Sequence, residues 1–79
     1  MKIQIDISGH QYSQTYVGEV IQWASTVVMY SNPGTIYYSV PSVTLRLDNS
    51  QEIKVIPLKE QYRDSKITVL EEAVVFEKI

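Results

Sequence analysis

The sequence predicts a two-layer α+β domain, in which one amphipathic helix covers one face of a mostly antiparallel sheet of five or six strands. Three observations lead to this fold class. Residues 2–8 alternate between aliphatic and polar side chains, residues 13–30 separate into two faces on a helical wheel, and residues 35–56 return to alternation with short turns. The expected order is strand, helix and then four strands, in a single domain that spans residues 1–79.

The first element is a strand with one buried face. Ile3, Ile5 and Ile7 alternate with polar residues over residues 2–8, which is the period of a half-buried strand. Residues 9–13 follow with Gly9 and Ser13, which are typical of a turn and of a helix cap.

For residues 13–30, intrinsic propensity and hydrophobic periodicity predict different structures. The segment is rich in threonine, valine and isoleucine and contains Gly18, and these residues favour a strand over a helix. At about 100° per residue, however, nearly all its apolar side chains fall on one half of a helical wheel, and only Met29 is misplaced. A wide apolar arc of this kind suits a helix that covers a sheet. We therefore expect a helix over about residues 13–30, and a hairpin turning at Gly18-Glu19 is the alternative.

A turn and a new strand follow the expected helix. Residues 31–34 read SNPG, which ends a helix because proline cannot continue it. In residues 35–40 the alternation places Ile36 and Tyr38 on one face and Tyr37 on the other. Pro41 is expected to separate this strand from the next one.

Three more segments complete the expected sheet. Residues 42–48 place Val43, Leu45 and Leu47 inside, and after a turn at residues 48–51 we expect Ile53 and Val55 to point inward and Glu52 and Lys54 outward. Pro57 marks the end of that strand or an edge position, residues 58–65 form a polar connection with one short helical turn at most, and residues 66–70 resume a strand. The last segment, residues 73–79, carries apolar residues at both parities, which is typical of a central strand or a subunit interface. We therefore expect a homo-oligomer, a dimer or higher, formed through this C-terminal strand.

Composition excludes several classes of protein. Seven basic residues against nine acidic ones give a net charge of −2, which disfavours a nucleic-acid-binding surface. The chain contains no cysteine, so it has neither disulfides nor a thiolate zinc site. The first residues lack the profile of a secretory signal, and no apolar run approaches the roughly 18 residues of a membrane span. We expect a cytoplasmic protein without membrane contact.

Candidate catalytic groups are scarce. His10 is the only histidine, and it could serve as an acid or base only together with Asp6 or Tyr12. Residues 48–52 resemble the start of a calcium loop but lack its required glycine. We therefore expect no enzyme activity, no catalytic residue, no metal site and no cofactor, and a minor hydrolase that uses His10 is the weakest alternative.

Tyrosine is the most informative residue type, with six in this short chain. Tyr16, Tyr30 and Tyr38 are expected in or near the core, and Tyr12, Tyr37 and Tyr62 at the surface, where tyrosine is favoured in binding sites. Arg46 and Lys54 are expected on the outward sheet face with Tyr37, as a platform for an anionic group and a stacked ring. The predicted binding residues are Tyr37, Arg46, Lys54, Tyr12 and Tyr62.

These features favour a small non-enzymatic interaction protein that binds, and by binding inhibits, another macromolecule, with a protein as the partner. Small acidic inhibitors from phages and mobile elements share this size and composition. The alternative is a small oligomeric protein that binds a ligand or nucleotide at the subunit interface through Tyr37, Arg46 and Lys54.

Overall fold

The computed structural model describes residues 1–31 and 34–72, and all regular structure in them is β-strand. The six strands follow one another along the chain: β1 spans Lys2–Gly9, β2 Tyr12–Tyr30, β3 Ile36–Leu47, β4 Ile53–Pro57, β5 Lys59–Glu60 and β6 Arg63–Glu71. No helix that could span a membrane occurs in this part of the chain.

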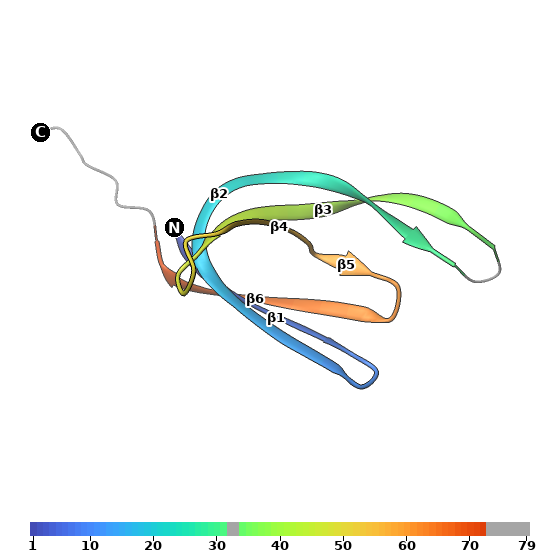
Figure 1. Cartoon of the computed structure of the whole chain (residues 1–79), viewed down its shortest axis with the longest axis horizontal. Helices are drawn as coiled ribbons and strands as arrows, with labels where there is room; N and C mark the ends of the chain where they lie inside the picture. Colours follow the sequence, from blue (N-terminus) through green and yellow to red (C-terminus); the bar gives the residue numbers. More distant parts are fainter. Residues whose placement is uncertain (32–33, 73–79) are drawn as a thin grey trace, which may run out of the picture.

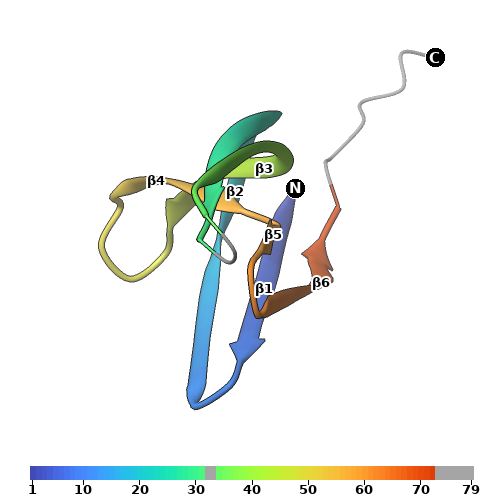
Figure 2. The ribbon, with the colours of Figure 1, turned by 90° about the vertical axis from the view of Figure 1, so that its right-hand side faces the viewer.

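The strands form one antiparallel sheet in the order β4-β3-β2-β1-β6-β5. β4 and β5 lie at opposite ends of this order, yet only Leu58 separates them along the chain. The sheet therefore curls on itself into a half-barrel, which the two views of the ribbon show (Figures 1 and 2). The amide of Leu58 donates a hydrogen bond of 2.9 Å to the carbonyl of Pro41, which ties the chain between β4 and β5 to β3.

The core lies on the concave face of the half-barrel. Its buried side chains come from β1, β3 and β4: Ile3, Ile5, Val43, Leu45, Leu47 and Ile56. Tyr16, Val20, Ile7 and Leu58 are partly buried against this cluster. The sequence prediction is confirmed for the strand at residues 2–8 and for the inward face of residues 43–47, since both segments keep one face against the core along their length.

Gly18 marks the place where β2 changes partner. It pairs with Ile3 of β1 on one side and with Leu47 of β3 on the other, and it is buried. A Cβ atom at this position would lie 2.2 Å from the carbonyl oxygen of Arg46. The close approach of the β3 backbone therefore requires glycine, which a strand interior otherwise disfavours.

The predicted helix at residues 13–30 is wrong, and with it the α+β fold class. These residues form β2, a strand of 19 residues, so the β propensity of its threonines, valines and isoleucines prevails. The alternation is hidden for two reasons. A bulge at Ile21, between Val20 and Gln22, shifts the parity of the side chains, and the strand meets different neighbours before and after it. The alternative hairpin at Gly18-Glu19 is also wrong, because β2 continues through both residues.

Two further strand predictions need correction. Pro41 does not separate two strands but lies within β3, at a position where β4 has not yet begun to pair, so its missing N–H costs no hydrogen bond on that side. In β4 the expected faces are reversed. Ile56 pairs with Val43 and is buried, so Lys54 shares the core side with Ile56, while Ile53 and Val55 are each 52% exposed.

The remaining segments are extended. Residues 58–65, expected to be a polar connection, contain β5, a two-residue turn and the start of β6, with no helical turn. The expected strand at residues 66–70 is confirmed as part of β6. The predicted oligomerisation strand at residues 73–79 lies outside the described residues.

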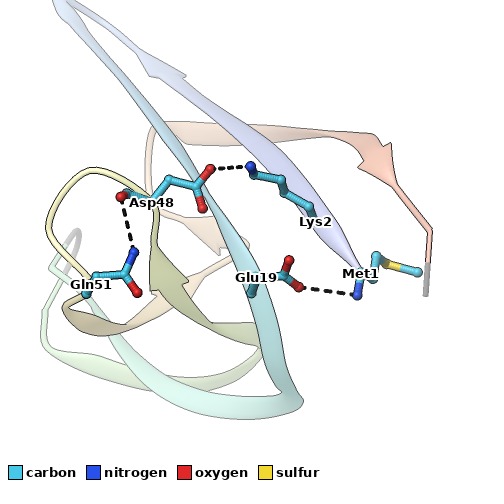
Figure 3. Close-up of polar contacts among 5 residues, drawn as sticks. All are labelled: Met1, Lys2, Glu19, Asp48 and Gln51. Carbon is cyan, nitrogen blue, oxygen red and sulfur yellow. Dashed lines mark hydrogen bonds and ion pairs between the residues drawn. The ribbon is translucent and has the colours of Figure 1, made fainter. Parts of the chain in front are cut away.

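Ion pairs connect the start of the chain to the β2–β3 part of the sheet. Lys2 Nζ lies 2.5 Å from Asp48 Oδ2, and the N-terminal amine lies 3.5 Å from Glu19 Oε2 (Figure 3). Gln51 donates a hydrogen bond of 3.2 Å to the Asp48 carbonyl. The pKa of Lys2 is raised because the hydrogen bond to Asp48, and then the Asp48 charge, favour the protonated amine.

Candidate functional site

A two-stranded arm projects from the half-barrel. β1 pairs with β2 only as far as Glu19, and β4 pairs with β3 only from Ser42 onward. Among the described strands, residues 21–30 of β2 therefore pair only with β3, and residues 36–41 of β3 pair only with β2, and we call these two segments the arm. Figure 1 shows the arm reaching beyond the other hairpins.

One face of the arm is apolar and exposed. Directly opposed residues of an antiparallel pair share a face, and the register pairs Met29 with Tyr37, Val27 with Ser39 and Trp23 with Val43. Trp23 is 50% exposed, Met29 56%, Val27 63% and Tyr37 67%. We call these four side chains the apolar face. Large hydrophobic side chains are exposed to solvent here, and contiguous exposed apolar surface is typical of interaction sites.

The opposite face of the arm is partly covered. Val28 and Val40 are buried, and the rings of Tyr30 and Tyr38 lie 4.7 Å apart at an angle of 50°. At the tip, the amide of Ser31 donates a hydrogen bond of 3.0 Å to the side chain of Gln61 in the β5–β6 turn. These contacts hold the tip of the arm at the β5–β6 turn. Beside this turn, Val27 and Met29 line a hollow of about 420 Å³ together with Pro57, Glu60, Gln61 and Arg63.

The arm carries no charge. From Val20 to Leu45 the sequence contains no aspartate, glutamate, lysine or arginine, and no histidine. Glu19 and Arg46, which pair with each other across β2 and β3, bound this region. Depletion of charge with enrichment of tryptophan, tyrosine and methionine is the composition of the buried centre of a protein interface.

A second hollow, of about 510 Å³, lies between two hairpin turns and shares Gln61 and Arg63 with the hollow lined by Val27 and Met29. Its lining comes from the β1–β2 turn and the β5–β6 turn: Gly9, His10, Tyr12, Gln61, Tyr62 and Arg63. The Arg63 guanidinium stacks 4.0 Å from the centre of the Tyr12 ring and forms an ion pair of 3.1 Å with Glu60. The volume falls in the range of small-molecule pockets, and stacking and a cation are both present.

Tyr62 stands out within this hollow. Its φ angle is 64°, a left-handed conformation that favours glycine or asparagine, and its side chain is 73% exposed. A bulky aromatic residue in this conformation is strained, and strain of this kind is concentrated at functional sites.

The structure brings two of the predicted binding residues together and separates the others. Tyr12 and Tyr62 line the same hollow, and Tyr37 lies on the arm. Arg46 is exposed on β3, nine residues from Tyr37, or about 30 Å along the strand.

Lys54 does not join Arg46 on the outward face. Its Nζ atom lies 5.5 Å from the centre of the Tyr16 ring, on the core side of β4. The expected platform of Tyr37, Arg46 and Lys54 is therefore not formed within one chain.

Sequence reasoning missed Trp23 and Val27 as surface residues, because the helical wheel assigned both to a buried face. It placed Met29 on the outward half of the wheel but did not identify it as a binding residue. The absence of charge over residues 20–45 was the signal that could have identified them.

The groups proposed for hydrolysis do not meet. Asp6 accepts hydrogen bonds of 2.8 Å from Thr15 and 3.1 Å from Gln4, which lower its pKa by stabilising the carboxylate. His10 is exposed in the β1–β2 turn, four residues away, or about 13 Å along the strand. Within residues 1–31 and 34–72 no cluster of three potential metal ligands occurs.

Comparison of the chain with family models, with curated proteins and with solved structures gives no match.

Proposed function

We propose that this protein is a small non-enzymatic interaction protein that binds another protein chain through the arm. The observation that carries the proposal is the apolar face, in which Trp23, Val27, Met29 and Tyr37 are each at least half exposed on one side of an uncharged ribbon. Large aromatic and methionine side chains contribute most of the binding energy when a partner removes them from water. The lack of cysteine is compatible with a reducing cytoplasm, which is the compartment we propose.

A protein fits this surface better than a nucleic acid. Nucleic-acid binding requires basic groups that neutralise phosphates, and residues 20–45 contain none. The chain as a whole carries a net charge of −2. The partner surface is accordingly apolar, with few charges at its centre.

Site-specific photo-cross-linking tests the proposal with a matched control. A photoreactive phenylalanine analogue replaces Tyr37 in one variant and Tyr62 in another, so the same group is placed at two tyrosines of similar exposure, on and off the arm. We expect a protein adduct of discrete mass from position 37 and none from position 62. Equal adducts from both positions, or no adduct from position 37, would contradict the proposal.

A small-ligand site in the hollow is the second candidate function. It is favoured by the stacked Arg63 and Tyr12 and by the strained, exposed Tyr62. A guanidinium beside aromatic rings suits an anionic ligand with a flat ring. Native mass spectrometry of the protein purified from its own host tests this candidate, because a retained ligand adds a stoichiometric mass and a bare mass argues against the site.

A further inference from the structure

The free edges of this sheet differ in how well they are protected against pairing with a strand of another chain. β4 carries Lys54 and Pro57, β5 is only two residues long and both are charged, and the free edge of β3 ends at Pro41. The open side of β6 carries Lys66 and Glu71. Charged residues, proline and short length are the features by which natural edge strands avoid pairing with other chains.

The edge of β2 in the arm has none of these features. Residues 21–30 read IQWASTVVMY, with no charge, no proline and no glycine, and among the described strands none pairs with this edge. Ten extended residues span about 33 Å, which is longer than a typical whole strand. An uncharged edge of this length is a template for another strand.

We propose that this edge of β2 pairs with the same edge of a second copy of the chain. The inference rests on the proposed function, since it names the partner of the same arm. A two-fold axis near the middle of residues 21–30 makes the two copies antiparallel, which is the arrangement of every strand pair in this sheet. The product is a continuous sheet with the order β3-β2-β2-β3 across the two copies.

Electrostatics allow this self-pairing. Glu19 is the charged residue of β2 nearest to the arm, and it lies eight residues, or about 26 Å, from Val27. This exceeds the screening length of about 8–10 Å at physiological salt, so Glu19 does not oppose a contact at the middle of the arm. Glu60 and Arg63 line a hollow together with Val27 and Met29, but they form an ion pair of 3.1 Å with each other, so their opposite charges compensate beside the arm. A different partner would more commonly be selected by complementary charge, and the arm offers no charge for that selection.

The available area also suits a dimer. A specific interface buries about 800 Å² on each partner, which is roughly a seventh of the 5910 Å² surface of this chain. The arm comprises about a fifth of the residues, no described strand pairs with its β2 edge, and the side chains of its apolar face are at least half exposed. Pairing places Val27 beside the strand of the second copy, so its exposed side chain gains cross-strand neighbours.

A charge-swap experiment tests the proposal. Val27→Lys and Val27→Glu each place like charges beside their counterparts near the two-fold axis, whereas a mixture of the two variants places opposite charges together. Molar mass is measured by light scattering and sedimentation, and the mixed species by native mass spectrometry. Val55→Lys is the matched control, since it makes the same change at a similarly exposed valine outside the arm.

We expect a mass of two chains for the wild type and for Val55→Lys, one chain for Val27→Lys and for Val27→Glu alone, and two chains again for their equimolar mixture. Circular dichroism verifies that each variant keeps its strand content. A wild type with the mass of one chain, or Val27 variants that both remain dimeric, would overturn the inference. A monomeric wild type that still gives an adduct with a different protein at position 37 overturns self-pairing alone and leaves the proposed function standing.

Discussion

Replacing Gly18 with alanine is expected to destabilise the fold, because β2 and β3 approach each other too closely there for a side chain. The added Cβ would lie 2.2 Å from the carbonyl oxygen of Arg46, 2.9 Å from its carbonyl carbon and 3.1 Å from the Cα atom of Leu47. All three contacts are backbone atoms, so no rotation of a side chain can relieve them. Ordinary contact begins at 3.4 Å, and the strands must therefore separate by about 1 Å.

The cost of this separation follows from the position of Arg46 in the sheet. Arg46 is paired with Glu19 on one side and with Ile53 on the other, so its carbonyl cannot move without disturbing two ladders. Inserting a methyl group into a close-packed position costs about 1–3 kcal/mol. A chain of 79 residues has a total stability of roughly 4–12 kcal/mol, so the substitution removes a substantial part of it.

Equilibrium unfolding in urea, followed by far-ultraviolet circular dichroism at one protein concentration, measures this loss. With a denaturant slope of about 1 kcal/mol per molar, the midpoint should fall by about 1–3 M. Ser25→Ala, an exposed substitution in the same strand, should change the stability by no more than about 0.5 kcal/mol. A Gly18→Ala midpoint equal to or above that of the wild type would refute the argument from close approach.

Three other predictions test the burial of the core, the dependence of stability on pH through Asp6, and the backbone strain at Tyr62. Leu45→Ala should lower the unfolding free energy by about 2–5 kcal/mol and Ile53→Ala by much less, because Leu45 is buried and Ile53 is half exposed. Equal losses in urea titrations would contradict this assignment of strand faces. The folded-state pKa of Asp6 is lowered, so its contribution is present above the unfolded value of 3.8 and is lost as the pH falls through the folded value. The midpoint difference between wild type and Asp6→Asn should therefore shrink as the pH is lowered below about 4, and a difference that is independent of pH would count against it. Tyr62→Asn should raise the unfolding free energy by about 0.5–1 kcal/mol in thermal melts, since asparagine tolerates a φ of 64° better, and a lower melting temperature would show that the tyrosine stabilises its turn.

The Tyr62 variant also bears on function. Tyr62 strains its own turn and exposes its ring, so its side chain is expected to contribute little to stability. A Tyr62→Asn variant that is more stable than the wild type but no longer retains a ligand would assign ligand binding to the hollow. The same reasoning applies to the arm, because the exposed side chains of Trp23, Met29 and Tyr37 contribute little to the stability of the isolated chain. The two binding roles that we propose would account for both surfaces.

The sequence alone determined the segments in which burial is uniform along a strand. β1 keeps Ile3 and Ile5 on the core face throughout, and β3 does the same with Val43 and Leu45, so period two was visible in both. Proline at position 57 ended its strand as expected, since β4 stops there. The scarcity of catalytic groups and the surface position of Tyr37 and Tyr62 could also be read from residue types and parity.

Only the tertiary structure decided the conformation of β2 and the location of the site. β2 leaves the half-barrel after Val20, passes a bulge at Ile21 and continues as an arm, so its two parts are buried by different neighbours and show no common alternation. A helical wheel found an apolar half because the segment is apolar at both parities, which in a helix would mean a buried face and in the arm means an exposed one. Which side of a strand meets the core depends on its partners, and those partners are distant in sequence.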